Sequence, residues 1–284
     1  ADSSLEASQT FVNGLLLTKT TGSVAEPILY TYDALGRPAS ETHPHHHDAP
    51  SIIAYVPSSN LILSETDPAG NSTTYSYHPD GQPGAGRIAV ITNALNQNTY
   101  RSYSPRGELT RTWGDTDYPV KYAYNDYGER TAMTTYRTGD DDNLWTTSTW
   151  PSPTPTGDTT TWIYDEATGL LTRKQYADSE GTDYTYTTAG QLATRTWARG
   201  VVTTYGYDTQ TGELTDVTYS DSTPNLAFTY NRIGQQETIT DATGTRSFEY
   251  RTDLQLEKEI LPTFYDQRQI SRTYQSGTPG TDVV

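Results

Sequence analysis

The chain has 284 residues, with 19 basic and 35 acidic side chains, a formal charge of −16 and no cysteine. These counts exclude a disulfide scaffold, a thiolate metal site and a cysteine nucleophile, and they argue against a nucleic-acid partner, because phosphate contacts need a basic face. No apolar run reaches the length of a membrane span.

The composition favours strands over helices. Only 33% of the residues are hydrophobic, yet the chain holds 23 tyrosines and 5 tryptophans. Tyrosine, tryptophan and threonine fit the half-exposed surface of a pleated sheet. We therefore predict an all-β protein whose aromatic side chains are buried between neighbouring strands, in place of a thick aliphatic core.

One motif recurs along the chain: an aromatic residue and a tyrosine two positions apart, then Asp or Asn, then Gly three or four residues later. In chain order the motif residues are Tyr30, Tyr32, Asp33 and Gly36; Tyr77 and Gly81; Tyr124, Asn125 and Gly128; Tyr164, Asp165 and Gly169; Tyr186 and Gly190; Tyr207, Asp208 and Gly212; Tyr230, Asn231 and Gly234; and Tyr250 in a decayed copy. The period is about 22 residues, which indicates a repeat array.

Each period predicts one β-hairpin. Two aromatic residues at alternate positions of a strand share a face, and Asp or Asn followed by Gly makes a tight turn. A second strand follows, as at 109–113, 192–197 and 214–219. Because one hairpin alone is marginal in water, successive hairpins should pair into a repetitive antiparallel β-hairpin strip, a solenoid-like spiral. The tyrosine hydroxyls are expected to point into water.

The spacing also predicts the organisation of the chain. Residues 1–24 read as a partial repeat, 25–137 and 161–261 as the repeats, 138–160 as an inserted loop rich in Trp, Pro and Asp, and 262–284 as a degenerate repeat and tail, with Tyr265 as a weak repeat start. No capping unit is evident, so we expect open strand edges that pair with copies of the chain or with more of the same repeat.

The segment from Tyr30 to Arg37 resembles the YD repeat of Rhs proteins, and the resemblance covers about residues 11–260. That family includes bacterial Rhs toxins, the C component of insecticidal toxin complexes, and animal teneurins. The resemblance implies a secreted or surface protein of a bacterium, whose repeats form a β-shell around an enclosed cargo. The self-cleaving end and the effector of the toxins are not found, and Asp67 to Gly70 reads as an ordinary turn between repeats.

Two polar clusters are candidate metal sites. His45, His47 and Asp48 lie in a histidine-rich run that could bind a transition metal, and Asp140 and Asp142 lie in an acidic run that could bind calcium. Imidazole nitrogens suit zinc, and carboxylate oxygens suit calcium. For each cluster the residues favour a solvated loop tip over a metal site. We predict no cofactor.

Three tryptophans near the inserted loop are candidates for glycan binding. Trp145, Trp150 and Trp162 could stack on sugar rings, or they could clamp the loop onto the sheet.

The repeated Asp residues fit turn geometry better than a single active site, so no catalytic residue is assigned. The sequence thus predicts a non-enzymatic structural segment that forms part of a shell, wall or filament. The alternatives are a carbohydrate-binding or adhesion module, and an enzyme acting on polysaccharides with His46 or His47 as the base.

Overall fold

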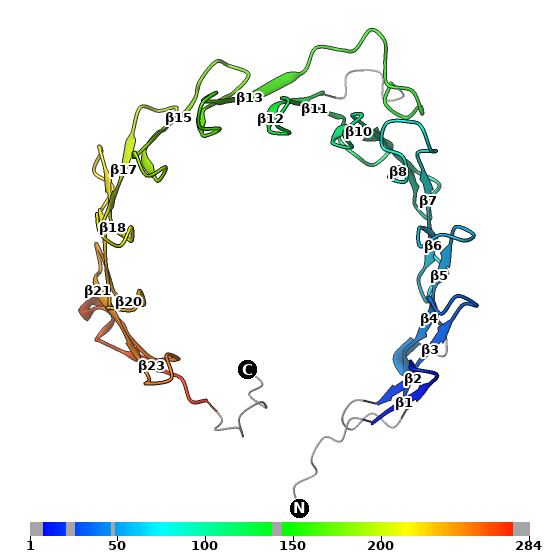
Figure 1. Ribbon diagram of the computed structural model, residues 1–284, viewed down its shortest axis with the longest axis horizontal. Helices are drawn as coiled ribbons and strands as arrows, with labels where there is room; N and C mark the ends of the chain where they lie inside the picture. Colours follow the sequence, from blue (N-terminus) through cyan, green and yellow to red (C-terminus); the bar gives the residue numbers. More distant parts are fainter. Residues whose placement is uncertain (1–7, 21–25, 47–48, 138–143, 275–284) are drawn as a thin grey trace, which may run out of the picture. The chain divides into compact units, whose positions relative to one another are not determined.

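The computed structural model describes residues 8–20, 26–46, 49–137 and 144–274 (Figure 1). Within these ranges the chain forms 23 strands and two short 3-10 helices, and it contains no α-helix. None of the described residues belongs to a helix that could cross a membrane. The predicted all-β fold class is therefore confirmed.

The chain divides into two compact units, 1–159 and 160–284. The first unit contains twelve complete strands within its described residues: β1 (Ser8–Val12), β2 (Leu15–Thr20), β3 (Ile28–Tyr32), β4 (Pro38–Thr42), β5 (Ser51–Tyr55), β6 (Ile62–Thr66), β7 (Ser72–Tyr77), β8 (Ile88–Thr92), β9 (Asn98–Tyr103), β10 (Leu109–Gly114), β11 (Val120–Tyr124) and β12 (Arg130–Thr135). The helix η1 (Pro44–His46) lies between β4 and β5.

The next strand, β13 (Asp158–Tyr164), begins at the end of the first unit and continues into the second. The other strands of the second unit are β14 (Leu171–Gln175), β15 (Gly181–Tyr186), β16 (Leu192–Thr196), β17 (Val202–Tyr207), β18 (Leu214–Tyr219), β19 (Leu226–Tyr230), β20 (Gln236–Asp241), β21 (Gly244–Tyr250), β22 (Leu256–Ile260) and β23 (Gln269–Ser271). The helix η2 (Thr263–Tyr265) precedes β23. Tyr265 therefore lies in a 3-10 turn, and it does not start a strand.

Within each unit every strand pairs antiparallel with the next strand of the sequence, which is the predicted hairpin strip. The pairing also contains a register shift that recurs at the same position of each copy. At the second tyrosine of each copy the register slips by one residue: Thr31 pairs with Ser40, but Tyr32 pairs with Pro38 and leaves Ala39 unpaired. The same slip recurs at Tyr186. Such a β-bulge bends the strand and increases its local twist.

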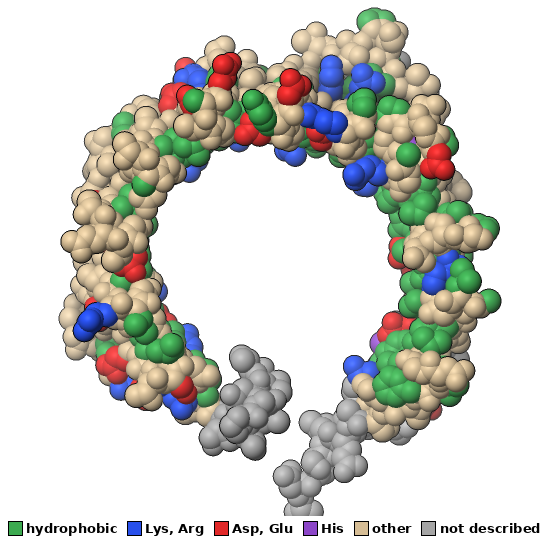
Figure 2. Space-filling model, viewed as in Figure 1, with side chains coloured by type: hydrophobic (Ala, Val, Ile, Leu, Met, Phe, Trp, Pro, Cys, Tyr) green, Lys and Arg blue, Asp and Glu red, His purple; other side chains and the backbone are tan. Residues whose placement is uncertain are grey.

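The sheet has two different faces, because residues paired across strands share a face. We call the face that carries Tyr30, Tyr32 and their partners the tyrosine face, and the other the hydroxyl face. On the hydroxyl face, threonine and serine hydroxyls bond across strands, as between Thr185 and Thr194 at 2.6 Å. Figure 2 shows hydrophobic side chains reaching the surface among charged ones in both units. Most motif tyrosines are only half-buried, as expected for a single layer of hairpins.

The segment between β12 and β13 runs from the end of β12 at Thr135 to the start of β13 at Asp158. Its described residues, 136–137 and 144–157, contain no strand. The last residue of the segment is therefore Gly157, and β13 begins within the predicted inserted loop at 138–160.

Candidate functional site

The turn after each second tyrosine is built by its Asp or Asn side chain. In the first complete copy, Asp33 Oδ1 accepts hydrogen bonds from the backbone nitrogens of Leu35 at 2.8 Å and Arg37 at 3.0 Å, while Gly36 takes the left-handed conformation with φ 77°. The hydrogen bond from the Arg37 side chain, followed by these backbone bonds, lowers the pKa of Asp33 below its ordinary value. The carboxylate is thus occupied in holding the turn.

The second tyrosine of most copies joins one hairpin to the preceding hairpin. Its hydroxyl donates a hydrogen bond to a backbone carbonyl at the start of the preceding hairpin's second strand. The bonds run from Tyr32 to Leu16 (2.9 Å), Tyr77 to Ile62 (2.6 Å), Tyr103 to Ile88 (3.1 Å), Tyr124 to Leu109 (2.9 Å), Tyr186 to Leu171 (2.9 Å), Tyr207 to Leu192 (3.0 Å), Tyr250 to Gln236 (2.9 Å) and Tyr274 to Leu256 (2.9 Å).

We call this hydrogen bond from the second tyrosine to the preceding hairpin the tyrosine clasp. It corrects two sequence predictions. The expectation that the hydroxyls point into water is wrong for these tyrosines, because their hydroxyls are bonded to protein. The copy that follows Tyr250 has its second tyrosine at Tyr274, and not near Tyr265, since Tyr274 makes the clasp bond. Burial raises the pKa of Tyr186 and Tyr207 above the ordinary value, in keeping with their packed position.

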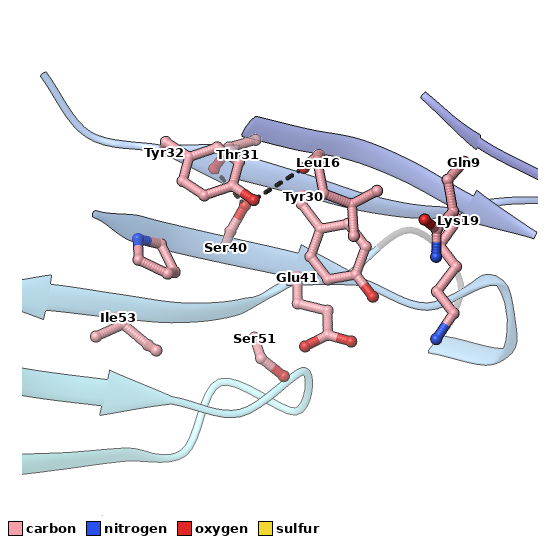
Figure 3. Close-up of a pocket in the computed structure, with 11 residues that line it drawn as sticks. Gln9, Leu16, Lys19, Tyr30, Thr31, Tyr32, Ser40, Glu41, Ser51 and Ile53 are labelled. Atoms are coloured by element: carbon pink, nitrogen blue, oxygen red, sulfur yellow. Dashed lines mark hydrogen bonds between the residues drawn. The ribbon is translucent and has the colours of Figure 1, made fainter. Parts of the chain in front are cut away.

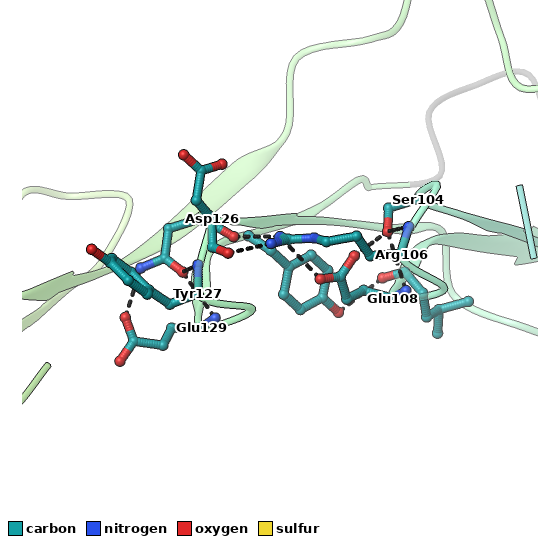
Figure 4. A network of polar contacts seen from close by, with 9 residues as sticks. Ser104, Arg106, Glu108, Asp126, Tyr127 and Glu129 are labelled. Carbon is teal, nitrogen blue, oxygen red and sulfur yellow. Dashed lines mark hydrogen bonds and ion pairs between the residues drawn. The ribbon is translucent and has the colours of Figure 1, made fainter.

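A second connection joins neighbouring turns along one edge of the strip (Figure 4). The Arg106 guanidinium, beside Glu108 at 3.0 Å, donates hydrogen bonds to the carbonyls of Asn125 and Asp126 in the next turn. Gln191 reaches the Gly212 carbonyl at 2.8 Å in the same way. Each such side chain reaches the turn of the next repeat. Neighbouring turns are therefore joined by these side chains, and neighbouring hairpins are joined separately by the tyrosine hydroxyls.

The buried aromatic cluster of the first unit forms where the inserted segment folds back on the sheet. Trp113, Tyr136, Trp145 and Trp150 are each 3–8% exposed and form one cluster. The Trp113 ring centre lies 5.4 Å from that of Trp150, and Trp113 Nε1 donates to the Thr147 carbonyl at 2.9 Å. Trp113 pairs with Tyr100 on the hydroxyl face, so the segment covers that face here.

The burial of this cluster bears directly on the glycan candidates. Trp145 and Trp150 have almost no exposed ring surface, so a sugar ring cannot stack on either one. Trp162 lies on β13 and is partly buried, with the Lys174 ammonium 5.7 Å from its ring centre. The geometry of the first two residues is that of a clamp.

The candidate metal ligands do not converge in the part of the chain that the structure describes. There, no group of three or more His, Asp or Glu side chains is arranged to hold an ion. His45 lies in η1, and His43 Nε2 contacts Glu41 Oε1 at 2.8 Å. His47, Asp48, Asp140 and Asp142 lie outside the described residues.

The tyrosine face of the first unit holds a cavity of about 410 Å³ that sequence reasoning missed (Figure 3). Its apolar lining includes Leu16 and Ile53, and its polar lining includes Lys19, Tyr30 and Glu41. Burial, and then the charge and hydrogen bond of Glu41, raise the pKa of Tyr30. One feature of the sequence could have indicated this cavity. Glu41 is an acidic residue that pairs across the hairpin with Tyr30, the first aromatic residue of its copy.

No protein-family model matches the sequence, and no curated relative matches it. Solved structures do share the fold. A crystal structure of TcdB2-TccC3-Cdc42 aligns with 89% of this chain at 16% identity and a TM-score of 0.52. TcdB2-TccC3 without its hypervariable C-terminal region aligns with a TM-score of 0.53, and a mutant Photorhabdus luminescens Tc holotoxin pore with 0.50.

This chain spans about 15% of the length of those toxin-complex chains. At identities of 15–16% the likeness shows a shared fold. The fold is thus that of a repetitive β-strip found in toxin complexes, which agrees coarsely with the Rhs-like resemblance.

Proposed function

We propose that the chain is a non-enzymatic structural segment of a bacterial secreted or surface protein, where it forms part of a β-shell or assembles into a wall or filament. The observation that carries the proposal is the tyrosine clasp. The same side chain makes the same bond between successive hairpins in both units, so the repeat positions are used to join neighbours. Similarity of fold to toxin-complex chains supports the same role.

The end strands support assembly through edges. Within the described residues β1 pairs only with β2, and β23 only with β22, and every residue of β1 and β23 is exposed. Phe11 on β1 is 57% exposed. A free strand edge pairs readily with another strand, so the partners we propose are copies of the chain or further repeats of a longer chain. A cargo enclosed by a complete shell is the corresponding partner in the shell form.

Negative-stain electron microscopy of the purified chain tests the proposal. We expect regular fibres or hollow particles, and Phe11→Lys should reduce them because it places a charge on the strand edge. Leu95→Lys, in the exposed turn between β8 and β9, is the matched control and should assemble normally. Isolated small particles at high protein concentration, with or without Phe11→Lys, would refute the assembly role.

A further inference from the structure

The repeats provide an internal comparison for the cavity beside Glu41. In each hairpin, the residue of the second strand that pairs with the first aromatic residue of the motif lies on the tyrosine face. Lys174 occupies it opposite Trp162, and Arg195 occupies it opposite Tyr184, with the guanidinium carbon 5.9 Å from the ring centre. Glu41 occupies the same position opposite Tyr30. This copy therefore has an acidic side chain where the two copies above have a basic one.

A second copy shows how the protein satisfies a carboxylate at this position. Glu259 lies opposite Phe248, and two arginines approach its carboxylate: Arg246 at 3.4 Å and Arg272 at 3.9 Å. The Glu259 side chain is 14% exposed, whereas that of Glu41 is 44% exposed. Burial of a carboxylate is tolerated when cations and hydrogen bonds compensate it, as they do at Glu259.

The same positions around Glu41 carry no arginine. Ile28 stands two residues before Tyr30, where Arg246 stands before Phe248. Glu41 pairs with Ser51 as Glu259 pairs with Ile270, so Ile53 stands where Arg272 stands. The two guanidinium groups of the Glu259 site are thus replaced by aliphatic side chains. Ile53, Tyr30 and Glu41 line the 410 Å³ cavity.

We propose that this cavity binds the guanidinium group of an arginine side chain on a partner polypeptide. A guanidinium makes paired hydrogen bonds to a carboxylate and stacks on an aromatic face, so Glu41 and the Tyr30 ring together match its chemistry. Glu41 already contacts His43 at 2.8 Å and the Tyr30 hydroxyl, but a carboxylate has about four lone-pair directions and keeps acceptor capacity. Leu16 and Ile53 provide an apolar lining for the methylene stem.

Lys19 gives the proposal its sharpest test. Its ammonium lines the cavity without forming an ion pair with any of the described residues, so it repels a bound cation and would attract a bound anion. Removing the charge in Lys19→Met should therefore strengthen arginine binding. A weakened affinity in Lys19→Met would contradict the proposal, because removing a positive charge from the lining should not weaken the binding of a cation there.

The probe is a capped peptide with one arginine, acetyl-Gly-Arg-Gly-amide, titrated into the full chain at physiological salt and followed by ligand-observed NMR. This salt screens the long-range field of the acidic surface. Glu41→Gln should weaken binding about tenfold or more, as expected for loss of a charge-assisted pair. The matched control is Glu65→Gln, which removes the same charge one repeat later. There the carboxylate accepts a hydrogen bond from the Tyr75 hydroxyl at 2.6 Å. The affinity of the Glu65→Gln variant for the peptide should stay within about twofold of that of the parent protein.

Two further arms keep the test decisive. Replacing arginine by citrulline keeps the shape and removes the charge, so binding should be lost. Ile28→Arg recreates the Arg246 position of the Glu259 site inside the chain and should abolish peptide binding without unfolding. Equal weakening by Glu41→Gln and Glu65→Gln, or equal binding of the citrulline peptide, would overturn the proposal. The proposal does not depend on assembly, so its failure would leave the structural role standing.

Discussion

Removing one clasp hydroxyl should loosen one pair of hairpins and leave the others intact. In Tyr186→Phe the ring stays, but the 2.9 Å bond from the hydroxyl to the Leu171 carbonyl is lost. An intramolecular hydrogen bond contributes about 1 kcal/mol net. That loss corresponds to about a fivefold larger equilibrium constant for local opening. Because stability in a repeat array is a sum over neighbours, the effect should concentrate in β14–β16.

Hydrogen exchange of backbone amides measures this opening strand by strand. The matched control is Tyr184→Phe, because within the described residues the Tyr184 hydroxyl makes no hydrogen bond although the ring lies on the same strand and face. We expect about fivefold faster exchange in β14–β16 of Tyr186→Phe and no change in Tyr184→Phe. Equal effects of the two variants, or an even change across both units, would refute the clasp as a local connection.

Three further predictions concern the aromatic cluster and two pH limits. Trp150→Ala should destabilise the first unit by roughly 3–5 kcal/mol in urea unfolding, because it empties a packed aromatic site, whereas Trp197→Ala at a 37% exposed ring should cost much less. The Glu65 hydrogen bond, and then burial, raise the pKa of Tyr75 to about 12, so the folded state loses stability as the pH rises from about 10 toward 12; ultraviolet titration should show the last ionisation moving down in Glu65→Gln. The turn carboxylates such as Asp33 have lowered pKa values, so their contribution is complete above about pH 4 and is lost as the pH falls below it; circular dichroism at decreasing pH should show unfolding begin there, and an acid-stable fold would contradict the turn argument.

The repeat and the fold class could be predicted because they depend on local rules. An aromatic residue, a tyrosine two positions later, and Asp or Asn with Gly specify a strand and a turn within a few residues, and recurrence at a fixed period specifies pairing between neighbours. The copy beginning at Tyr30 contains every one of these signals, and the structure forms the expected hairpin from β3 and β4, with a bulge at Tyr32 that the motif does not predict.

The site residues were less accessible to sequence reasoning, since exposure depends on distant contacts. The sequence favoured a clamp over a sugar platform for Trp145 and Trp150, but nothing in their spacing shows which face of the sheet they meet. The structure buries them against Trp113, which lies more than thirty residues earlier. Trp113 alone, at the end of a predicted second strand, carried no sign of this partner.

The sequence by itself determined the period, the turns and the alternation of faces, because all three arise from interactions between residues close in the chain. Tertiary structure decided which hydroxyls are bonded, which tryptophans are covered and which repeated carboxylate has arginine neighbours. Tyr186 reaches back fifteen residues to its carbonyl, and Glu41 and Glu259 occupy the same register with different neighbours. Such differences arise from packing between hairpins, where one substituted neighbour changes what a repeated residue contacts.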